Sequence, residues 1–315
     1  MERMLNSVRS SLAIVILFAT ASPAQQPASS APASRAPASG PEAAASTASP
    51  TDPREIVRRS VEVDHHNWEL ARSYTCRQHE VEKDLDRHGQ ARSTKTRTYD
   101  VNFYYGELYS RLIQKDDQPL NEADQKKEDE KLEKFLAKLR NQSEEERDRR
   151  LSKEKKEHEE ERLFLRDMVN AYDFTLVGSE TVNGTDAWVI DAAPRKDFRP
   201  TQPHADMLSK IKGRIWIEKK DYNWVKVEAE SIDTISFGLF LFRIHKGAHF
   251  SLDQVHLNDE VWLFHRIYVN GSARLALFKN LAVEQEDEFT NYKRFSATTR
   301  ILPGVHEVPS DSPKQ

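Results

Sequence analysis

The chain has 315 residues, a formal net charge of −4 and a hydrophobic content of 37%, which allows one large domain or two small ones. The near-neutral balance and the lack of a basic stripe interleaved with aromatic residues give no electrostatic reason to expect nucleic-acid binding. Cys76 is the single cysteine, so an intramolecular disulfide is excluded. Cys76 falls in an expected strand, and we interpret it as an inert, buried or half-buried thiol.

The N-terminus has the form of an export signal. Two arginines precede the apolar run 12–21, and Ser22-Pro23-Ala24 follows it as a small-x-small cleavage site. The run is shorter than the roughly 20 residues that a membrane-spanning helix needs. We expect residues 1–24 to be a signal peptide cleaved near Ala24 and the mature protein to be soluble and periplasmic; an uncleaved anchor is the alternative. Residues 25–50 are rich in Ala, Pro and Ser, which predicts a disordered linker.

A single folded domain is expected from residue 51 to residue 302, and it begins with a helix. Asp52 and Pro53 suit the cap and first turn of a helix that continues to about Arg72. Period-two patterns then indicate a meander of three strands. These strands are expected at 74–85, 93–105 and 108–113.

A charged helical insertion is expected at residues 121–170. Apolar residues occur at helical spacing on a charged background, and Ser143 with Glu146 matches a capping box for the second of two helices. Opposite charges alternate closely enough for i,i+4 pairs to stabilise these helices in water. We interpret the insertion as a solvated helical hairpin, with a docking surface for a protein partner as the alternative.

Strands resume after the insertion, and their centre is the hairpin 213–230. Ile215 and Ile217 alternate with polar or aromatic residues before a turn, and Val225 and Val227 alternate with charged residues after it. Two Asn-Gly pairs, Asn183-Gly184 and Asn270-Gly271, predict turns. Further strands are expected at 174–181, 186–192, 231–245, 249–256, 261–269, 273–279 and 281–289, with a short helix at 206–210 and a loose tail at 303–315.

The predicted fold class is therefore α+β, with about ten antiparallel strands, a leading helix and an inserted helical pair. Strands that follow one another without βα repeats argue against a doubly wound fold. A closed barrel, a sandwich, and one strongly curved sheet with helices on its concave side all remain open.

The sequence offers little to support catalysis. The chain contains no His-Glu-x-x-His, no Gly-x-Ser-x-Gly, no phosphate-binding glycine loop and no cysteine pair. His245 and His249 are four residues apart, but they flank an expected turn, and the other histidines are interpreted as surface or strand-end residues. We predict a protein that is not an enzyme and has no metal site and no cofactor.

The segment 235–244 suggests a different kind of site, because it is apolar on both faces of an expected strand. A sheet that is wet on one side needs only one apolar face, so a second apolar face calls for a cover: helices, or a lipid. Ordinary core packing is the alternative. Alternation along the strands assigns the following side chains to the wall of a cargo pocket: Trp188, Ile190, Ile215, Ile217, Val225, Val227, Phe240 and Phe242.

Three stretches together resemble the outer-membrane lipoprotein-sorting (LolA-like) superfamily. They are the hairpin pattern 177–190, the strand Gly213-Arg-Ile-Trp-Ile-Glu218, and the long strands ending near Tyr292-Lys-Arg-Phe295. The resemblance covers most of residues 54–302. It implies an unclosed half-barrel with helices against its concave face, binding acyl chains or lipoproteins in the periplasm.

Taken together, these features predict a monomeric, non-enzymatic periplasmic binder or carrier of lipid, acylated protein or other apolar cargo. The alternative is an envelope signalling or assembly factor that carries no lipid. It would act through protein contacts of the charged helices.

Overall fold

The computed structural model describes residues 52–237, 242–275 and 279–295. The expected signal peptide, linker and tail, and Phe240, lie outside these residues. The helices are α3 (Pro53–Ala71), α4 (Glu122–Arg140) and α5 (Glu144–Ala171), with the 3₁₀ helix η1 (Ala205–Lys210). The strands are β1 (Tyr74–Leu85), β2 (Ala91–Tyr104), β3 (Glu107–Lys115), β4 (Gln118–Pro119), β5 (Tyr172–Val182), β6 (Thr185–Pro194), β7 (Ile211–Glu218), β8 (Trp224–Ser231), β9 (Ile235–Phe237), β10 (Phe242–Ile244), β11 (His249–Leu257), β12 (Val261–Leu275) and β13 (Lys279–Arg294).

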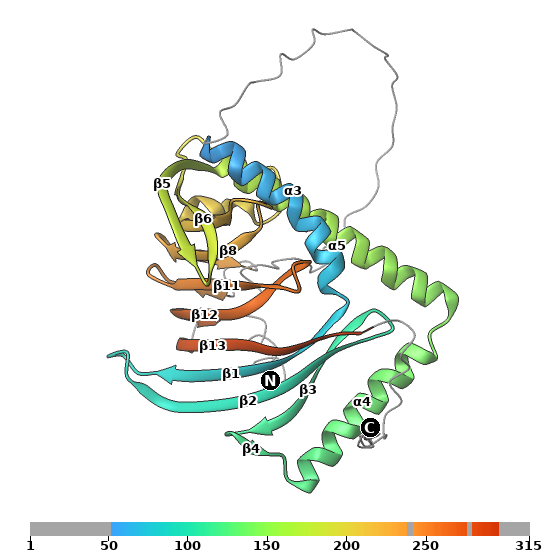
Figure 1. Cartoon of the computed structure of the whole chain (residues 1–315). Helices are drawn as coiled ribbons and strands as arrows, with labels where there is room; N and C mark the ends of the chain where they lie inside the picture. Colours follow the sequence, from blue (N-terminus) through green and yellow to red (C-terminus); the bar gives the residue numbers. More distant parts are fainter. Residues whose placement is uncertain (1–51, 238–241, 276–278, 296–315) are drawn as a thin grey trace, which may run out of the picture.

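All of the described strands belong to one antiparallel sheet. Its order is β4-β3-β2-β1-β13-β12-β11-β8-β7-β6-β5, with β9 and β10 joined beside β12. Figure 1 shows the strands following one another from β5 at the top to β4 at the bottom, so the sheet curves without closing. The predicted α+β fold with an open half-barrel is confirmed, whereas the closed barrel and the sandwich are not found.

The helices pack mainly on the upper part of the sheet, where α3 and α5 cross it side by side (Figure 1). The cap of α3 forms as predicted, because the Asp52 carboxylate accepts from the Arg54 backbone N–H at 3.1 Å. The predicted capping box of α5 is also confirmed, with Ser143 and Glu146 bonding each other's backbone N–H groups. Local capping chemistry therefore places both helix starts.

The insertion is only partly the solvated hairpin that we expected. α4 buries Leu132, Leu136 and Leu139, and Phe135 meets Tyr109 of β3 with a ring separation of 4.7 Å. The end of α5 contributes Phe164, Met168 and Val169 to buried clusters. The mainly exposed part runs from Glu144 to about Lys156. The apolar residues at the end of α5 explain the difference, because they need a core to pack against.

Two strand predictions are wrong. Residues 231–245 do not form one strand, because β9 and β10 lie within this range and pair with each other in antiparallel orientation. Asn270-Gly271 is not a turn, since β12 continues straight through it. A Cβ added to Gly271 would lie 2.7 Å from the Cβ of Ala248, so this glycine permits a close approach of two strands. The turn predicted at Asn183-Gly184 is confirmed, with φ values of 52° and 82°.

Candidate apolar binding face

One line of paired residues crosses nine strands on a single face of the sheet, because directly paired residues of neighbouring strands project to the same side. We call this side the inner face, since α3 and α5 pack against its upper part. From β5 to β2 the line reads Leu176, Ile190, Ile215, Val227, Leu252, Ile267, Asp287, Glu80 and Arg97. The first six are apolar and the last three are charged, so the inner face has an apolar section and a polar section.

The opposite face carries paired charges. Arg214 of β7 lies 2.6 Å from the Asp191 carboxylate of β6, and Arg266 of β12 lies 2.7 Å from Glu286 of β13. Side chains of this kind form cross-strand ion pairs that are partly solvated and contribute little stability each. The opposite face also has a buried apolar cluster around Val189, Trp216 and Trp262, so the inner face differs from it by an apolar line that continues across six strands.

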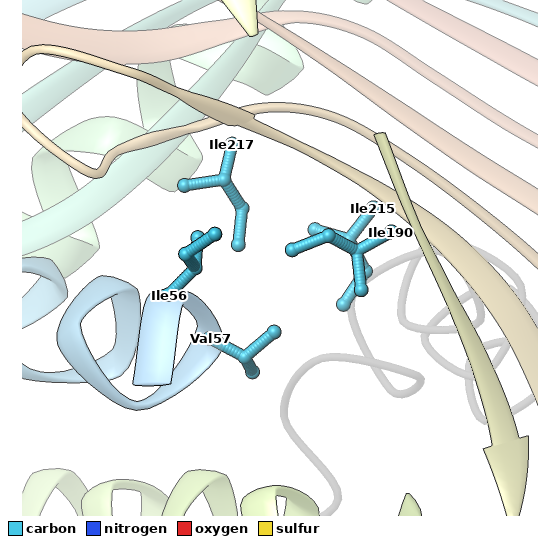
Figure 2. Close-up of a cluster of buried hydrophobic side chains, with 5 residues drawn as sticks. All are labelled: Ile56, Val57, Ile190, Ile215 and Ile217. Atoms are coloured by element: carbon cyan, nitrogen blue, oxygen red, sulfur yellow. The ribbon is translucent and has the colours of Figure 1, made fainter. Parts of the chain in front are cut away.

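Helix α3 covers one part of the apolar section. Figure 2 shows Ile56 and Val57 of α3 pointing toward Ile190, Ile215 and Ile217 of the sheet. All five side chains are buried, and four of them are fully inaccessible or nearly so. Close packing of this kind leaves no space for a cargo between α3 and these strands while the helix stays in place.

Polar contacts fasten α3 along its length. The Trp224 indole N–H donates to the Ser60 hydroxyl at 2.8 Å. Farther along, the Asn67 amide bonds both the backbone carbonyl and the backbone N–H of Trp262, at 2.8 and 2.7 Å. At the start of the helix, the Arg54 guanidinium donates to the carbonyls of Val169 and Tyr172 at 2.9 and 3.0 Å. Arg54 thereby satisfies carbonyl groups at the end of α5, where a cation is favourable.

The middle of the apolar section has a different composition. Its buried residues are Phe250, Leu252, Ile267 and Val269. Within the described part of the chain, the cluster around them is built from strand side chains, with no helix residue among its members. The residues packed against it are Val227, Ala229, Phe264 and Phe289. We call these eight residues the central cluster.

The polar section begins beside the central cluster. Asp287 is 2% exposed and accepts from the amides of Gln78 and Gln285, both at 2.8 Å. Burial raises the pKa of the Asp287 carboxyl above its ordinary value, although the two amide donors oppose this effect. The carboxylate is therefore held by neutral donors in a place where its charge is poorly solvated.

Arg97 of β2 pairs with two buried carboxylates of β1. Its guanidinium contacts Glu80 and lies 3.3 Å from Glu82. Burial raises the pKa of the Glu80 carboxyl, with Arg97 acting in the opposite direction. Among the described residues, no group of three or more His, Cys, Asp or Glu side chains has the arrangement of a metal site. These charged side chains of β1, β2 and β13 thus form a polar border beside the apolar section.

The predicted pocket residues divide among several places. Five of the eight (Trp188, Ile190, Ile215, Ile217 and Val227) lie together around α3. Phe242 is half-buried and packs with Ile235, Ile244 and Phe164. Phe240 lies outside the described residues.

The expected placement of Val225 on the inner face is wrong. Val225 packs with Val189 and Trp216, which point to the other side of β6 and β7. The pairing of β7 with β8 shifts by one residue at this point, from Trp216↔Lys226 to Ile217↔Trp224. Val225 is the extra residue of this β-bulge, and a bulge reverses the alternation on which our prediction depended.

Sequence reasoning did not select most of the central cluster. Phe250, Leu252, Ile267 and Val269 alternate with polar residues in expected strands, so a period-two signal was present. Their meeting on one face depends on the pairing of β11 with β12, which the sequence does not specify. The buried carboxylates of β1 carried no signal at all, because polar residues occupy both faces of that strand.

The single cysteine lies on β1, next to β2 and β13. Cys76 is half-buried, as predicted, and burial raises the pKa of its thiol to about 12, which disfavours the nucleophilic thiolate. Within residues 52–237, 242–275 and 279–295, no helix combines the length and apolar character that crossing a bilayer requires.

Comparisons with known proteins give only distant likenesses. No family model matches the chain, and no curated protein does. Among solved structures, a putative outer membrane lipoprotein-sorting protein domain from Vibrio parahaemolyticus is 12% identical, with a TM-score of 0.31 over 77% of this chain and 95% of that one. A LolA superfamily protein from Nitrosomonas europaea is 9% identical, with a TM-score of 0.26 over 78% and 94%.

The MucA/MucB complex of Pseudomonas aeruginosa contains a chain that is 12% identical, with a TM-score of 0.24 over 78% of this chain and 100% of that one. The structural neighbours thus include the superfamily that the sequence resembles. TM-scores this low support no statement about this chain, and the site described above rests on its own side chains.

Proposed function

We propose that the protein is a non-enzymatic binder of apolar cargo, such as a lipid or an acylated protein, and that the cargo lies along the central cluster. The observation that carries this proposal is the apolar line from Leu176 to Ile267, which crosses six strands of a sheet that does not close. Strands spaced about 4.8 Å apart make this line roughly 24 Å wide. Such a surface suits an elongated apolar molecule better than a compact polar one.

The energetics of an acyl chain fit this surface. Removing a sixteen-carbon chain from water is worth about 12 kcal/mol at about 0.8 kcal/mol per methylene. A cavity lined by Val, Leu, Ile and Phe recovers most of that energy, so the cargo can leave a membrane without a large uphill step. Leu252 and Ile267 are 1% and 4% exposed, so the acyl chain would reach them by displacing the groups that cover them, and the carboxylates beyond Ile267 would mark its polar end.

Helix α3 sets the size of the site in this proposal. Where Ile56 and Val57 pack on the sheet, cargo and helix exclude each other. Binding confined to the central cluster leaves α3 in place, whereas a larger cargo displaces the helix at the cost of the Ser60–Trp224 and Asn67–Trp262 contacts. The signal-peptide pattern adds the expectation that binding takes place in the periplasm, after cleavage near Ala24.

The test compares two variants that carry the same substitution. Val227→Trp fills the inner face beside Leu252, and Val177→Trp adds the same bulk at the exposed sheet edge, where Val177 is 52% exposed. Protein purified without detergent is examined by native mass spectrometry and with a fluorescent fatty-acid probe. We expect bound lipid or probe in the parent and in Val177→Trp, and none in Val227→Trp. An empty parent that does not change the probe fluorescence contradicts the proposal.

A role in envelope signalling or assembly is the second candidate. The observation that favours it is the exposed first half of α5, where Arg147 and Arg149 form no ion pair with another described residue. This candidate predicts a protein partner and no lipid. The empty parent in the experiment above is the result that would favour it.

A further inference from the structure

Large exposed apolar side chains occur at two places on the molecule, and most of them are at one end. Four are prominent among the described residues: Tyr105, Leu108, Leu151 and Val177. The first two lie at the turn between β2 and β3, and the third lies in the early part of α5. Val177 lies on β5, at the other edge of the sheet.

Side-chain contacts hold the turn and the helix together. Arg150 of α5, the residue before Leu151, lies 2.9 Å from the Glu107 carboxylate and donates to the Tyr105 carbonyl at 3.4 Å. Arg72, the residue that caps α3, donates to the Gly106 carbonyl at 3.0 Å and also pairs with Glu154 of α5. The turn is therefore anchored to the end of α3 and to the early part of α5, and Tyr105 and Leu108 are exposed beside this support.

The adjoining part of α5 is positively charged. From Arg147 to Lys156 it holds six basic and two acidic residues. Arg147, Arg149 and Lys155 are exposed and form no ion pair with another described residue. Three glutamates precede this stretch in the first turn, where their charge complements the N-terminal end of the helix dipole. We call Tyr105, Leu108, Leu151 and these three unpaired cations the apex.

We propose that the apex docks the protein on the surface of an anionic phospholipid bilayer. Exposed tyrosine and leucine side chains can enter the interfacial region of a bilayer, and nearby unpaired cations are attracted by anionic headgroups. The two features occur together at this end of the molecule. A nucleic-acid or polysaccharide partner would use the cations and leave Leu108 and Leu151 without a role.

Docking at the apex would bring the membrane beside the end of α3, because Arg72 joins that helix to the turn. α3 is the helix that covers part of the apolar face. A bilayer at the apex would thus lie close to the cover of the candidate cargo site, which gives the surface a use beyond simple attachment.

The first experiment measures co-sedimentation of the full chain with vesicles of phosphatidylglycerol and of phosphatidylcholine. The test variant is Arg147→Gln/Arg149→Gln/Lys155→Gln. Each cation near an anionic surface is worth about fivefold in affinity, so we expect a loss of about a hundredfold. The matched control is Lys126→Gln/Lys134→Gln/Lys138→Gln. It removes three exposed lysines of α4 that form no ion pair with another described residue. Glutamine preserves helix propensity, and circular dichroism confirms folding.

The proposal predicts binding to phosphatidylglycerol over phosphatidylcholine, loss in the test variant and no loss in the control. Equal binding to both lipids, binding to neither, or equal loss in both variants overturns it. Binding of the fatty-acid probe in solution should be unchanged in the test variant, which separates this proposal from the proposed function.

The second experiment locates the contact. In a Cys76→Ala background, an environment-sensitive dye is attached through Leu108→Cys or, as the control, through Val177→Cys. We expect phosphatidylglycerol vesicles to shift the emission at position 108 to shorter wavelength and to leave position 177 unchanged. A shift at 177 that equals or exceeds the shift at 108 overturns the proposal.

Discussion

Ile267 of β12 lies directly opposite Asp287 of β13, and at this pair the inner face of the sheet changes from apolar to charged. Both side chains are buried, at 4% and 2% exposure. An apolar line that spans six strands ends here, and a carboxylate held by two glutamine amides begins the polar section. In the proposed function, the position of this border would give a bound amphiphile a direction, with its apolar part on the Ile267 side.

The border also makes stability depend on pH. The folded pKa of Asp287 lies above its unfolded value of about 3.8 because burial penalises the charged form. Its favourable contribution is complete below the unfolded pKa and is lost as the pH rises through the folded pKa. Glu80 acts in the same direction.

We therefore expect Asp287→Asn to gain stability relative to the parent between pH 4 and pH 8, by about 1.4 kcal/mol for each unit by which the pKa is raised. Urea unfolding at several pH values measures this difference. Asp148→Asn on the exposed surface of α5 is the control and should follow the parent. A parallel course of the Asp287→Asn and parent curves would show that the carboxyl titrates alike in the folded and unfolded states.

Packing under α3 can be tested by truncation. Ile217 is fully buried against Ile56 and Val57, so Ile217→Ala should lower the free energy of unfolding by about 2–5 kcal/mol. Val177→Ala removes exposed methyl groups and should change it by less than about 0.5 kcal/mol. Chemical denaturation checks both values. A small effect at Ile217 would mean that α3 is not packed on this part of the sheet.

The bond between Ser60 and Trp224 tests how α3 is fastened. Ser60→Ala leaves the half-buried Trp224 indole N–H without its acceptor and should cost about 1–3 kcal/mol. Trp224→Phe removes the donor, and the double variant completes a thermodynamic cycle. We expect a coupling energy of about 0.5 kcal/mol or more. Additive losses in the double variant would show that the two side chains do not interact in solution.

Gly271 tests the course of β12. Gly271→Ala brings a methyl group against Ala248 and should destabilise the protein by about 1–3 kcal/mol. Adding Ala248→Gly removes the opposing methyl group and should recover part of that loss. A neutral Gly271→Ala, or a double variant that recovers nothing, would show that position 271 does not approach Ala248 in solution.

Whether a feature could be predicted from the sequence depended on how far apart in the chain its contacting residues lie. Features fixed by neighbouring residues were predictable: the Asp52 and Ser143 caps, the Asn183-Gly184 turn and the alternation of Ile215 and Ile217. Each depends on contacts within a few residues of chain.

Features fixed by partners distant in sequence were not predictable. Val225 changed sides because of a bulge against β7, and Asn270-Gly271 stayed extended because β12 pairs there with β11 and β13. The polar section required β1 to lie between β13 and β2. A pattern within one strand does not specify which other strand it pairs with.

The most direct test of the central claim is photolabelling with a fatty acid that carries a diazirine near the end of its chain, followed by peptide mass spectrometry. The proposed site predicts labels on β8, β11, β12 and β13, centred on Val227, Leu252, Ile267 and Phe289. Unlabelled fatty acid should compete for these positions, and Val227→Trp should abolish them. Labels confined to the exposed half of α5 or spread evenly over the surface, or the absence of competition, would contradict an apolar cargo site on the inner face.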